Sequence, residues 1–242
     1  MKDFYNQRSR FSRGPNRYLE LASRTKIVKL IKKLIPPLAG QVNYLDVGCG
    51  NCLGTEYFVN LLRKITKREV KATGVDIAPS CKNTEVSTLR LDLNSQRIPF
   101  SKHFHIATVF ETIEHVFNTD FMLESISNSL VNRGLLIVTT LNIVCWKNRI
   151  LVPLGIQPIN TEVSTKKLTY GYKLGFLKKY VGKWKPSGHI RPFTLNSLTE
   201  LLEDSNFQVV HTFGLENWRV AKLFEKFAKG LCTGIGVLAI RR

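Results

Sequence analysis

The sequence of this chain predicts an α/β fold, in which a mostly parallel sheet of seven strands carries helices on both faces. Three observations support this expectation. Short apolar runs of strand length alternate along the chain with segments of helical periodicity, a glycine-rich turn follows the first of these runs, and acids end the next two. The last two expected strands form an antiparallel hairpin at the edge of the sheet.

Each element is expected from its apolar spacing and its flanking residues. The expected strands are 42–47, 70–75, 87–91, 105–110, 135–140, 207–213 and 234–240. The expected helices are 16–35, 54–65, 121–130, 195–202 and 216–229. Two consecutive prolines, Pro36 and Pro37, end the first helix. Only sixteen residues separate Asp76 from Asp92, which leaves little room for a helix on that side of the sheet.

The chain divides into a basic N-terminal arm and helix, residues 1–40, and one α/β domain, residues 41–242. Within the domain, the strand–helix alternation breaks after Asn142 and resumes near residue 188. The interrupting segment, 143–187, mixes aromatic residues with nine Lys or Arg and one acid. We interpret residues 143–187 as an insertion that forms a lid over an acceptor.

Positive charge is concentrated outside the first half of the domain. The net charge is +18, whereas the stretch 41–142 carries equal numbers of basic and acidic residues. A neutral centre flanked by basic segments predicts an anionic partner, which is a nucleic acid, an acidic or phosphorylated small molecule, or an anionic membrane surface. The alternative is that the charge serves solubility alone.

The cysteines and the apolar runs predict a cytoplasmic protein. The cysteines number five, which argues against a disulfide framework and for a reducing compartment. The polar start is unlike a signal peptide. The longest uncharged apolar stretch, 134–146, is shorter than the roughly 20 residues that a membrane-spanning helix needs. A peripheral position at the inner face of the membrane is the alternative location.

Two strand ends together predict a nucleoside-binding crevice. The run Leu45-Asp46-Val47-Gly48-Cys49-Gly50 ends a strand in an acid and a Gly-x-Gly turn, and Thr73-Gly74-Val75-Asp76 ends the next strand in a second acid. Glycines allow the backbone to approach a ligand closely. An acid at the end of the neighbouring strand can accept hydrogen bonds from a ribose.

These residues resemble the class I S-adenosylmethionine-dependent methyltransferases, over roughly 41–213. The resemblance rests on Leu45–Gly50, Asp76-Ile77, Asp92-Leu93, the segment Phe110–His115 and the later run Gly188–Thr194. It implies a Rossmann-like fold and S-adenosyl-L-methionine as the cofactor. The implied cofactor-binding residues are Asp46, Gly48, Gly50, Asp76, Ile77, Asp92, Leu93 and Glu111.

The resemblance assigns a role to each part of this crevice. Gly48 and Gly50 would turn beneath the methionine moiety, and Asp76 would accept hydrogen bonds from both ribose hydroxyls. Asp92 would accept from the adenine amine, with Ile77 and Leu93 on the two faces of the ring. Asp46 would contact the cofactor, or alternatively would only stabilise the glycine turn.

The acid–histidine segment after the fourth strand is the expected catalytic region. Glu111, Glu114 and His115 have the spacing that brings side chains together on a helical turn. His115 is a candidate general base, since imidazole titrates near neutrality, and Glu114 would assist it. A second interpretation follows from a resemblance to metal-assisted O-methyltransferases: Glu111, Glu114, His115 and His189 would hold Mg²⁺, Mn²⁺ or Zn²⁺. In a third, Glu111 shapes the cofactor pocket while the other two cap the next helix.

Three hypotheses for the function of this chain stay open, and the first two differ in the methyl acceptor. The preferred hypothesis is O-methylation of a small-molecule, glycan or lipid-linked acceptor. The lysines of the insertion would then bind a phosphate of the acceptor or dock on an anionic membrane face. The alternative is an RNA methyltransferase, since interleaved aromatic and lysine residues also bind single strands. A lesser alternative is a non-catalytic binding protein on the same fold. Residues 216–231 have a basic amphipathic pattern, which suits a membrane surface or a helix packed on the sheet.

Overall fold

A computed structural model of the chain describes residues 21, 24–36, 40–82, 85–216, 218 and 221–242. The expected basic arm, residues 1–15, lies outside the described residues. Within them, strands and helices alternate along the chain up to residue 141 and again from residue 195, except that the strands 70–76, 86–90 and 104–110 follow one another with no helix among the described residues between them. The expected α/β class is therefore confirmed.

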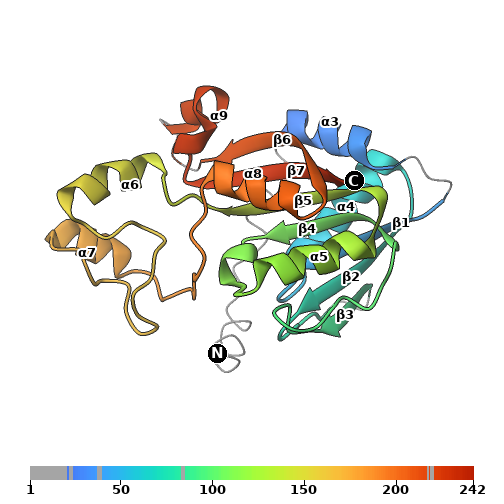
Figure 1. Cartoon of the computed structure of the whole chain (residues 1–242), viewed down its shortest axis with the longest axis horizontal. Coiled ribbons are helices and arrows are strands. Elements are labelled where there is room, and N and C mark those ends of the chain that lie inside the picture. Colours follow the sequence, from blue (N-terminus) through green and yellow to red (C-terminus); the bar gives the residue numbers. More distant parts are fainter. Residues whose placement is uncertain (1–20, 22–23, 37–39, 83–84, 217, 219–220) are drawn as a thin grey trace.

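A single sheet of seven strands organises the molecule (Figure 1). Its spatial order is β3-β2-β1-β4-β5-β7-β6. The strands are β1 (Val42–Val47), β2 (Val70–Asp76), β3 (Val86–Arg90), β4 (Phe104–Phe110), β5 (Leu130–Leu141), β6 (Phe207–Leu215) and β7 (Gly234–Arg241). The pairs among β1 to β5 are parallel, whereas β7 runs antiparallel to both β5 and β6. The mostly parallel sheet with an antiparallel edge hairpin is thus as expected.

Helices cover both faces of the sheet, because the strands are apolar on both sides. On one face, α5 (Thr119–Ser129) and α8 (Leu195–Asp204) bury Met122, Leu123 and Leu198 against the strands. On the other face, α3 (Thr25–Leu34) and α4 (Leu53–Thr66) bury Ile31 and Phe58. The helix of the N-terminal segment is therefore part of the domain core.

The connection between β2 and β3 forms no helix among its described residues, 77–82 and 85. The sequence already indicated this from the short spacing between Asp76 and Asp92. Two other contacts fix the connection. Ser80 N–H donates to the Gly50 carbonyl (2.9 Å), and a disulfide joins Cys81 to Cys52. This side of the sheet is held to the glycine turn in place of a packed helix.

The expected single helix over 216–229 is wrong. The described residues form a 3₁₀ turn (Ala221–Leu223), the one-turn α9 (Phe224–Phe227) and a second 3₁₀ turn (Lys229–Leu231). The α-helical run ends at Ala228, whose φ of −146° and ψ of 60° are not helical. Ahead of these turns, the carboxylate of Glu216 accepts hydrogen bonds from Trp218 N–H and from the backbone and hydroxyl of Thr233. Burial raises the pKa of Glu216, but these bonds outweigh it and the net pKa is lowered.

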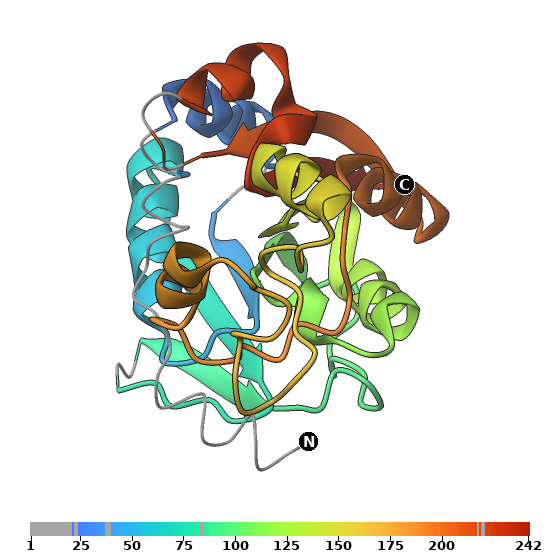
Figure 2. The ribbon, with the colours of Figure 1, turned by 90° about the vertical axis from the view of Figure 1, so that its left-hand side faces the viewer.

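The insertion 143–187 folds around a small core of its own (Figures 1 and 2). Its elements are α6 (Trp146–Leu151), a 3₁₀ turn (Val152–Leu154) and α7 (Gly175–Val181). Leu151, Ile156, Tyr172 and Val181 are buried together. The insertion follows directly from the carboxyl end of β5 and lies to the left of the sheet in Figure 1. Among the helices that the structure describes, none is long and apolar enough to cross a bilayer.

Candidate functional site

The strand order places the candidate site at the carboxyl edge of the sheet. β2 and β4 lie on opposite sides of β1, so the connections after β1 and β4 lead away in opposite directions. Open α/β sheets bind ligands in the crevice that forms at such a point. The glycine turn follows β1, Asp76 ends β2, and Glu111 follows β4. The fold therefore brings the predicted residues to one edge.

The glycine turn needs both of its glycines. Gly48 and Gly50 have φ angles of +82° and +53°, in the left-handed region that other residues avoid. A Cβ on Gly48 would also lie 2.1 Å from Thr112 Oγ1. The turn is tied to β2 by Gly48 N–H, which donates to the Val75 carbonyl at 2.7 Å. The absence of a side chain at Gly48 lets the turn pack against the segment after β4.

Asp76 organises the backbone around itself. Its Oδ2 accepts from Gly50 N–H and its Oδ1 from Ala78 N–H, both at 2.9 Å. These bonds hold the carboxylate in place between the glycine turn and the chain after β2. A carboxylate has about four acceptor positions, so two remain for other donors. This arrangement suits the expected bidentate contact with two ribose hydroxyls.

Asp46 is placed differently from a cofactor ligand. Its side chain is fully buried, and its two oxygens accept from the hydroxyls of Thr55 (2.5 Å) and Thr108 (2.7 Å). Thr108 in turn bonds the hydroxyl of Tyr44 at 2.6 Å. These bonds join β1 to β4 and to the first turn of α4. The structure thus favours the alternative interpretation, in which Asp46 stabilises the base of the turn.

Of the three residues expected around the adenine, two are accessible and one is buried. Asp92 is half-buried, and its Oδ1 accepts from both the backbone N–H and the side-chain amide of Asn94. Ile77, the residue directly after β2, is also half-buried, whereas Leu93 belongs to the hydrophobic core that includes residues of α5. Asp92 and Ile77 are therefore accessible enough to meet a ligand. Leu93, with 8% of its surface exposed, supports the site from below.

The turn after β4 has a strained backbone. Glu111 has a φ of +50°, which is uncommon outside glycine and concentrates at functional sites. Its Oε1 accepts from Thr139 Oγ1 on β5 at 3.2 Å. The helical turn starts later, as a 3₁₀ turn over Ile113–His115. The expectation that Glu111 shares a helical turn with Glu114 and His115 is therefore wrong.

Glu114, His115 and His189 do come together. Their ligand atoms lie within 4.8 Å of one another, and the two imidazole rings stack with centroids 4.9 Å apart. Glu111 is not part of this group. Glu114 is almost fully buried, and its Oε2 accepts from Thr140 Oγ1 at 2.9 Å. Three of the four residues predicted as metal ligands are thus brought together from two distant segments.

The tautomer of His115 follows from its partner. Nδ1 lies 2.9 Å from the carbonyl of Gly188, and a carbonyl only accepts, so Nδ1 carries the hydrogen in the neutral ring. Nε2 then carries the lone pair, at 3.9 Å from Glu114 Oε1. A proton taken up at Nε2 would face this carboxylate. The pair is arranged as a general base and its stabilising anion.

Glu162 is a site residue that the sequence analysis missed. Its Oε1 lies 3.3 Å from His189 Nδ1, and its carboxylate also accepts from the backbone N–H groups of Ser187 and Gly188. Its side chain is only 7% exposed. A signal was available, because Glu162 is the one acid in the basic insertion. A single acid kept among nine basic residues indicates a specific partner.

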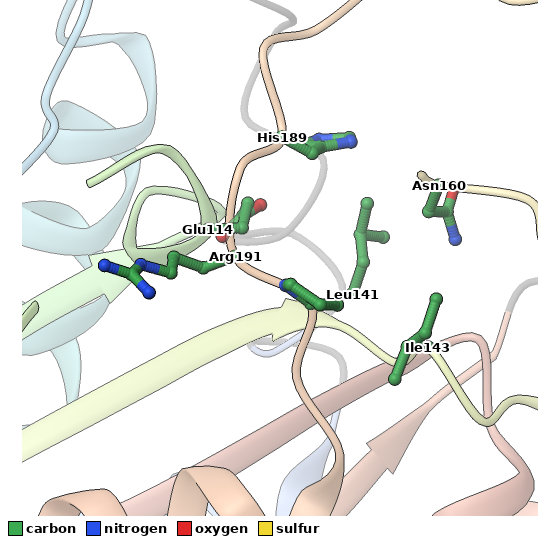
Figure 3. Close-up of a pocket in the computed structure, with 7 residues that line it drawn as sticks. Glu114, Leu141, Ile143, Asn160, His189 and Arg191 are labelled. Carbon is green, nitrogen blue, oxygen red and sulfur yellow. The ribbon is translucent and has the colours of Figure 1, made fainter. Parts of the chain in front are cut away.

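A pocket opens beside this cluster (Figure 3). Glu114 and Arg191 lie on one side of it, and Ile143 and Asn160 of the insertion lie on the other. It is lined by Glu114, Leu141, Ile143, Asn160, His189, Arg191 and Pro192. The insertion therefore forms one wall of the pocket next to the acid–histidine cluster.

The cysteines near the glycine turn include a disulfide, whereas the odd number of cysteines argued against a disulfide framework. Cys52, the N-cap of α4, is joined to Cys81, while Cys49 is a buried thiol beside them. Burial raises the pKa of Cys49, and the nearby Asp46 and Asp76 raise it further. Cys49 is thus protonated at neutral pH and unsuited to attack the disulfide. The disulfide links the two loops that border Asp76.

A comparison with protein-family models identifies the family of this chain. The family model described as a methyltransferase domain matches residues 16–212. No curated protein sequence matches this chain significantly.

Solved methyltransferases share the fold at low sequence identity. An S-adenosylmethionine-dependent methyltransferase from Thermotoga maritima, described as a possible histamine N-methyltransferase, is 16% identical with a TM-score of 0.57, covering 94% of this chain and 91% of its own. One from Clostridium acetobutylicum is 13% identical with a TM-score of 0.55, covering 93% and 92%. One from Mesorhizobium loti is 15% identical with a TM-score of 0.53, covering 88% and 96%.

We expect Gly48→Ala to destabilise the protein more than a left-handed glycine alone explains. Gly155→Ala is the matched control, since Gly155 also has a positive φ (+65°) but open space around its Cβ position. The control should cost about 1–2 kcal/mol from backbone strain. Gly48→Ala should cost a further ~1–3 kcal/mol from the clash with Thr112. Urea unfolding measures both, and equal losses would contradict the close packing.

We expect the Cys52–Cys81 disulfide to stabilise the fold. The two cysteines are 29 residues apart, and closing a loop of this length restricts the unfolded chain by about 3–4 kcal/mol. Cys81→Ser should therefore lower the free energy of unfolding by this order in oxidising buffer. In reducing buffer, wild type and variant should unfold at nearly the same urea concentration. A difference that persists after reduction would argue against the disulfide.

Proposed function

Since this chain belongs to the methyltransferase-domain family and is an S-adenosylmethionine-dependent enzyme, we propose that it methylates a hydroxyl oxygen of a small-molecule, glycan or lipid-linked acceptor. The acid–histidine cluster beside the pocket carries this proposal. Methyl transfer to an alcohol releases a proton, and the cluster offers a base for it.

The proposed reaction joins the acceptor oxygen to the methyl carbon. The bond from that carbon to the sulfonium sulfur breaks, and its electron pair stays on sulfur. The hydroxyl proton passes to Nε2 of His115. This nitrogen carries the lone pair because Nδ1 donates its hydrogen to the Gly188 carbonyl. The resulting imidazolium is stabilised by Glu114 at 3.9 Å. Alignment of the oxygen with the methyl group supplies the rest of the acceleration.

His189 and Glu162 support the same role. The ring of His189 stacks on that of His115, and Glu162 restrains His189 through its contact with Nδ1. Asn160 and Arg191 line the pocket on either side and offer polar groups to an acceptor. In this proposal His189 positions the acceptor hydroxyl for His115.

A metal at the cluster is the second candidate, favoured by the close approach of the three ligand groups. One carboxylate and two imidazoles suit Mn²⁺ or Zn²⁺ better than Mg²⁺, which prefers oxygen ligands. Glu114, His115 and His189 would hold the ion. When bound, it would lower the pKa of the acceptor hydroxyl.

We expect Asp76→Asn to weaken cofactor binding. Each charge-assisted bond to a ribose hydroxyl contributes about 1.5–3 kcal/mol, and an amide offers one acceptor oxygen in place of two. Affinity for S-adenosylhomocysteine, measured by calorimetry, should fall about 10-fold to 150-fold on this basis. Glu85→Gln, an exposed acid of the neighbouring connection, is the control and should bind normally. Normal binding by Asp76→Asn would remove the ribose contact.

We expect His115→Gln to abolish most of the turnover while cofactor affinity stays unchanged. Glutamine can still donate to the Gly188 carbonyl, but it cannot take up the proton, and general bases contribute about 10²–10⁴-fold. Transfer of isotopically labelled methyl to acceptors in metabolite and lipid extracts measures turnover. His211→Gln, on β6, is the matched control.

Two results would change this assignment. Unchanged turnover in His115→Gln would exclude the histidine as the base. Loss of wild-type turnover on chelation, with recovery on added Mn²⁺ or Zn²⁺, would assign the cluster to a metal.

A further inference from the structure

The insertion 143–187 is rich in exposed apolar side chains. Phe176 and Leu154 are 70% and 66% exposed, although the segment also has four buried side chains that form a core of its own. More than half of the large apolar side chains that are exposed in the described chain lie on this segment: Ile150, Val152, Leu154, Val163, Tyr170, Leu174, Phe176, Tyr180 and Trp184. Monomeric surfaces rarely gather so many, and such patches mark binding surfaces.

The exposed charge of the same segment is of one sign. Its exposed charged residues are all basic: Arg149, Lys166, Lys167, Lys173, Lys178, Lys179, Lys183 and Lys185. The one acid, Glu162, is turned inward to His189 and to the backbone of Ser187 and Gly188. The partner of this segment is therefore both anionic and apolar.

From these two properties we propose that the insertion 143–187 docks on an anionic lipid bilayer. On α7 and the turn after it, Phe176, Tyr180 and Trp184 follow one another at four-residue intervals, and the last two rings meet edge to face at 4.6 Å. Aromatic residues of this kind settle at the boundary between hydrocarbon and headgroups. Lysines keep their charge at the headgroups while their stems lie along the apolar surface.

The aliphatic residues distinguish a bilayer from RNA. Single-stranded RNA is bound by aromatic side chains that stack on bases and by cations along the backbone. Ile150, Val152 and Leu154, next to one another at the end of α6, have no ring to stack. Their exposure is explained by hydrocarbon, which every apolar side chain enters favourably.

Docking would bring the candidate active site to the lipid surface. Ile143 and Asn160 belong to the insertion and wall the pocket that Glu114 and His189 line (Figure 3). Resting on the function proposed above, the acceptor is then a hydroxyl group carried by a lipid, which enters the pocket from the bilayer surface. The basic residues hold the enzyme there through headgroup phosphates.

The test is co-sedimentation of the full chain with vesicles of phosphatidylcholine, with and without phosphatidylglycerol, in the absence of cofactor. We expect binding to the anionic vesicles, weakened by salt. Lys178→Gln/Lys179→Gln should lower the affinity about 25-fold, which is ~1 kcal/mol per basic residue. Lys32→Gln/Lys33→Gln, an equal loss of charge on exposed residues of α3, is the matched control and should change it less than about twofold.

A second pair of variants tests whether exposed apolar side chains contribute to vesicle binding. Phe176→Ala should weaken vesicle binding about tenfold, since an apolar ring leaves the interface. Phe227→Ala removes a ring outside the insertion that is even more exposed, at 81% against 70% for Phe176, and should leave binding unchanged.

Three results would overturn the docking surface. The first is that the protein does not bind anionic vesicles, and the second is that the control variants lose as much vesicle affinity as the test variants. The third is that the protein retains single-stranded RNA but not vesicles, which would establish the RNA alternative. Labelled methyl transfer into a total lipid extract then tests the acceptor. Label that enters only water-soluble compounds would overturn the lipid-borne acceptor while confirming the proposed methyl transfer. No label in any extract would contradict the proposed function and leave the vesicle result standing.

Discussion

The site depends on the close approach of two backbone turns at the carboxyl edge of the sheet. Gly48 can lie against Thr112 only because it has no side chain. The same turn presents the amide of Gly50 to Asp76, which also holds the amide of Ala78. One carboxylate therefore sets the geometry of two loops before any ligand arrives. Such preorganisation lowers the entropy that binding must otherwise overcome.

The acid–histidine cluster is shared between the domain and its insertion. His115 lies in the turn after β4, but its partner carbonyl belongs to Gly188, and Glu162 holds both the backbone of that segment and His189. The proposed base is thus oriented by residues more than forty positions away along the chain. A change in the insertion would alter the tautomer and the orientation of the ring, even without contact with a substrate.

The sequence predicts the parts of this molecule that local periodicity and strand ends determine. All seven strands lie where alternation placed them, and Asp76 and the glycines meet at one edge because parallel strands end together. Long-range polar contacts leave no such local pattern in the sequence. The carboxylate of Glu216 bonds Thr233, and Cys52 pairs with Cys81 across the glycine turn. Neither partner can be read from spacing, because each bond depends on the fold already being formed.

The insertion explains how a small pocket can serve a selective enzyme. Its inner side supplies Ile143, Asn160 and Glu162 to the pocket and the cluster, while its outer side carries Phe176 and the lysines. The two sides are joined by a core of four buried residues. Glu162, on the inner side, contacts His189 and thereby links the insertion to the acid–histidine cluster. Selectivity would then come from where the pocket opens as much as from which groups line it.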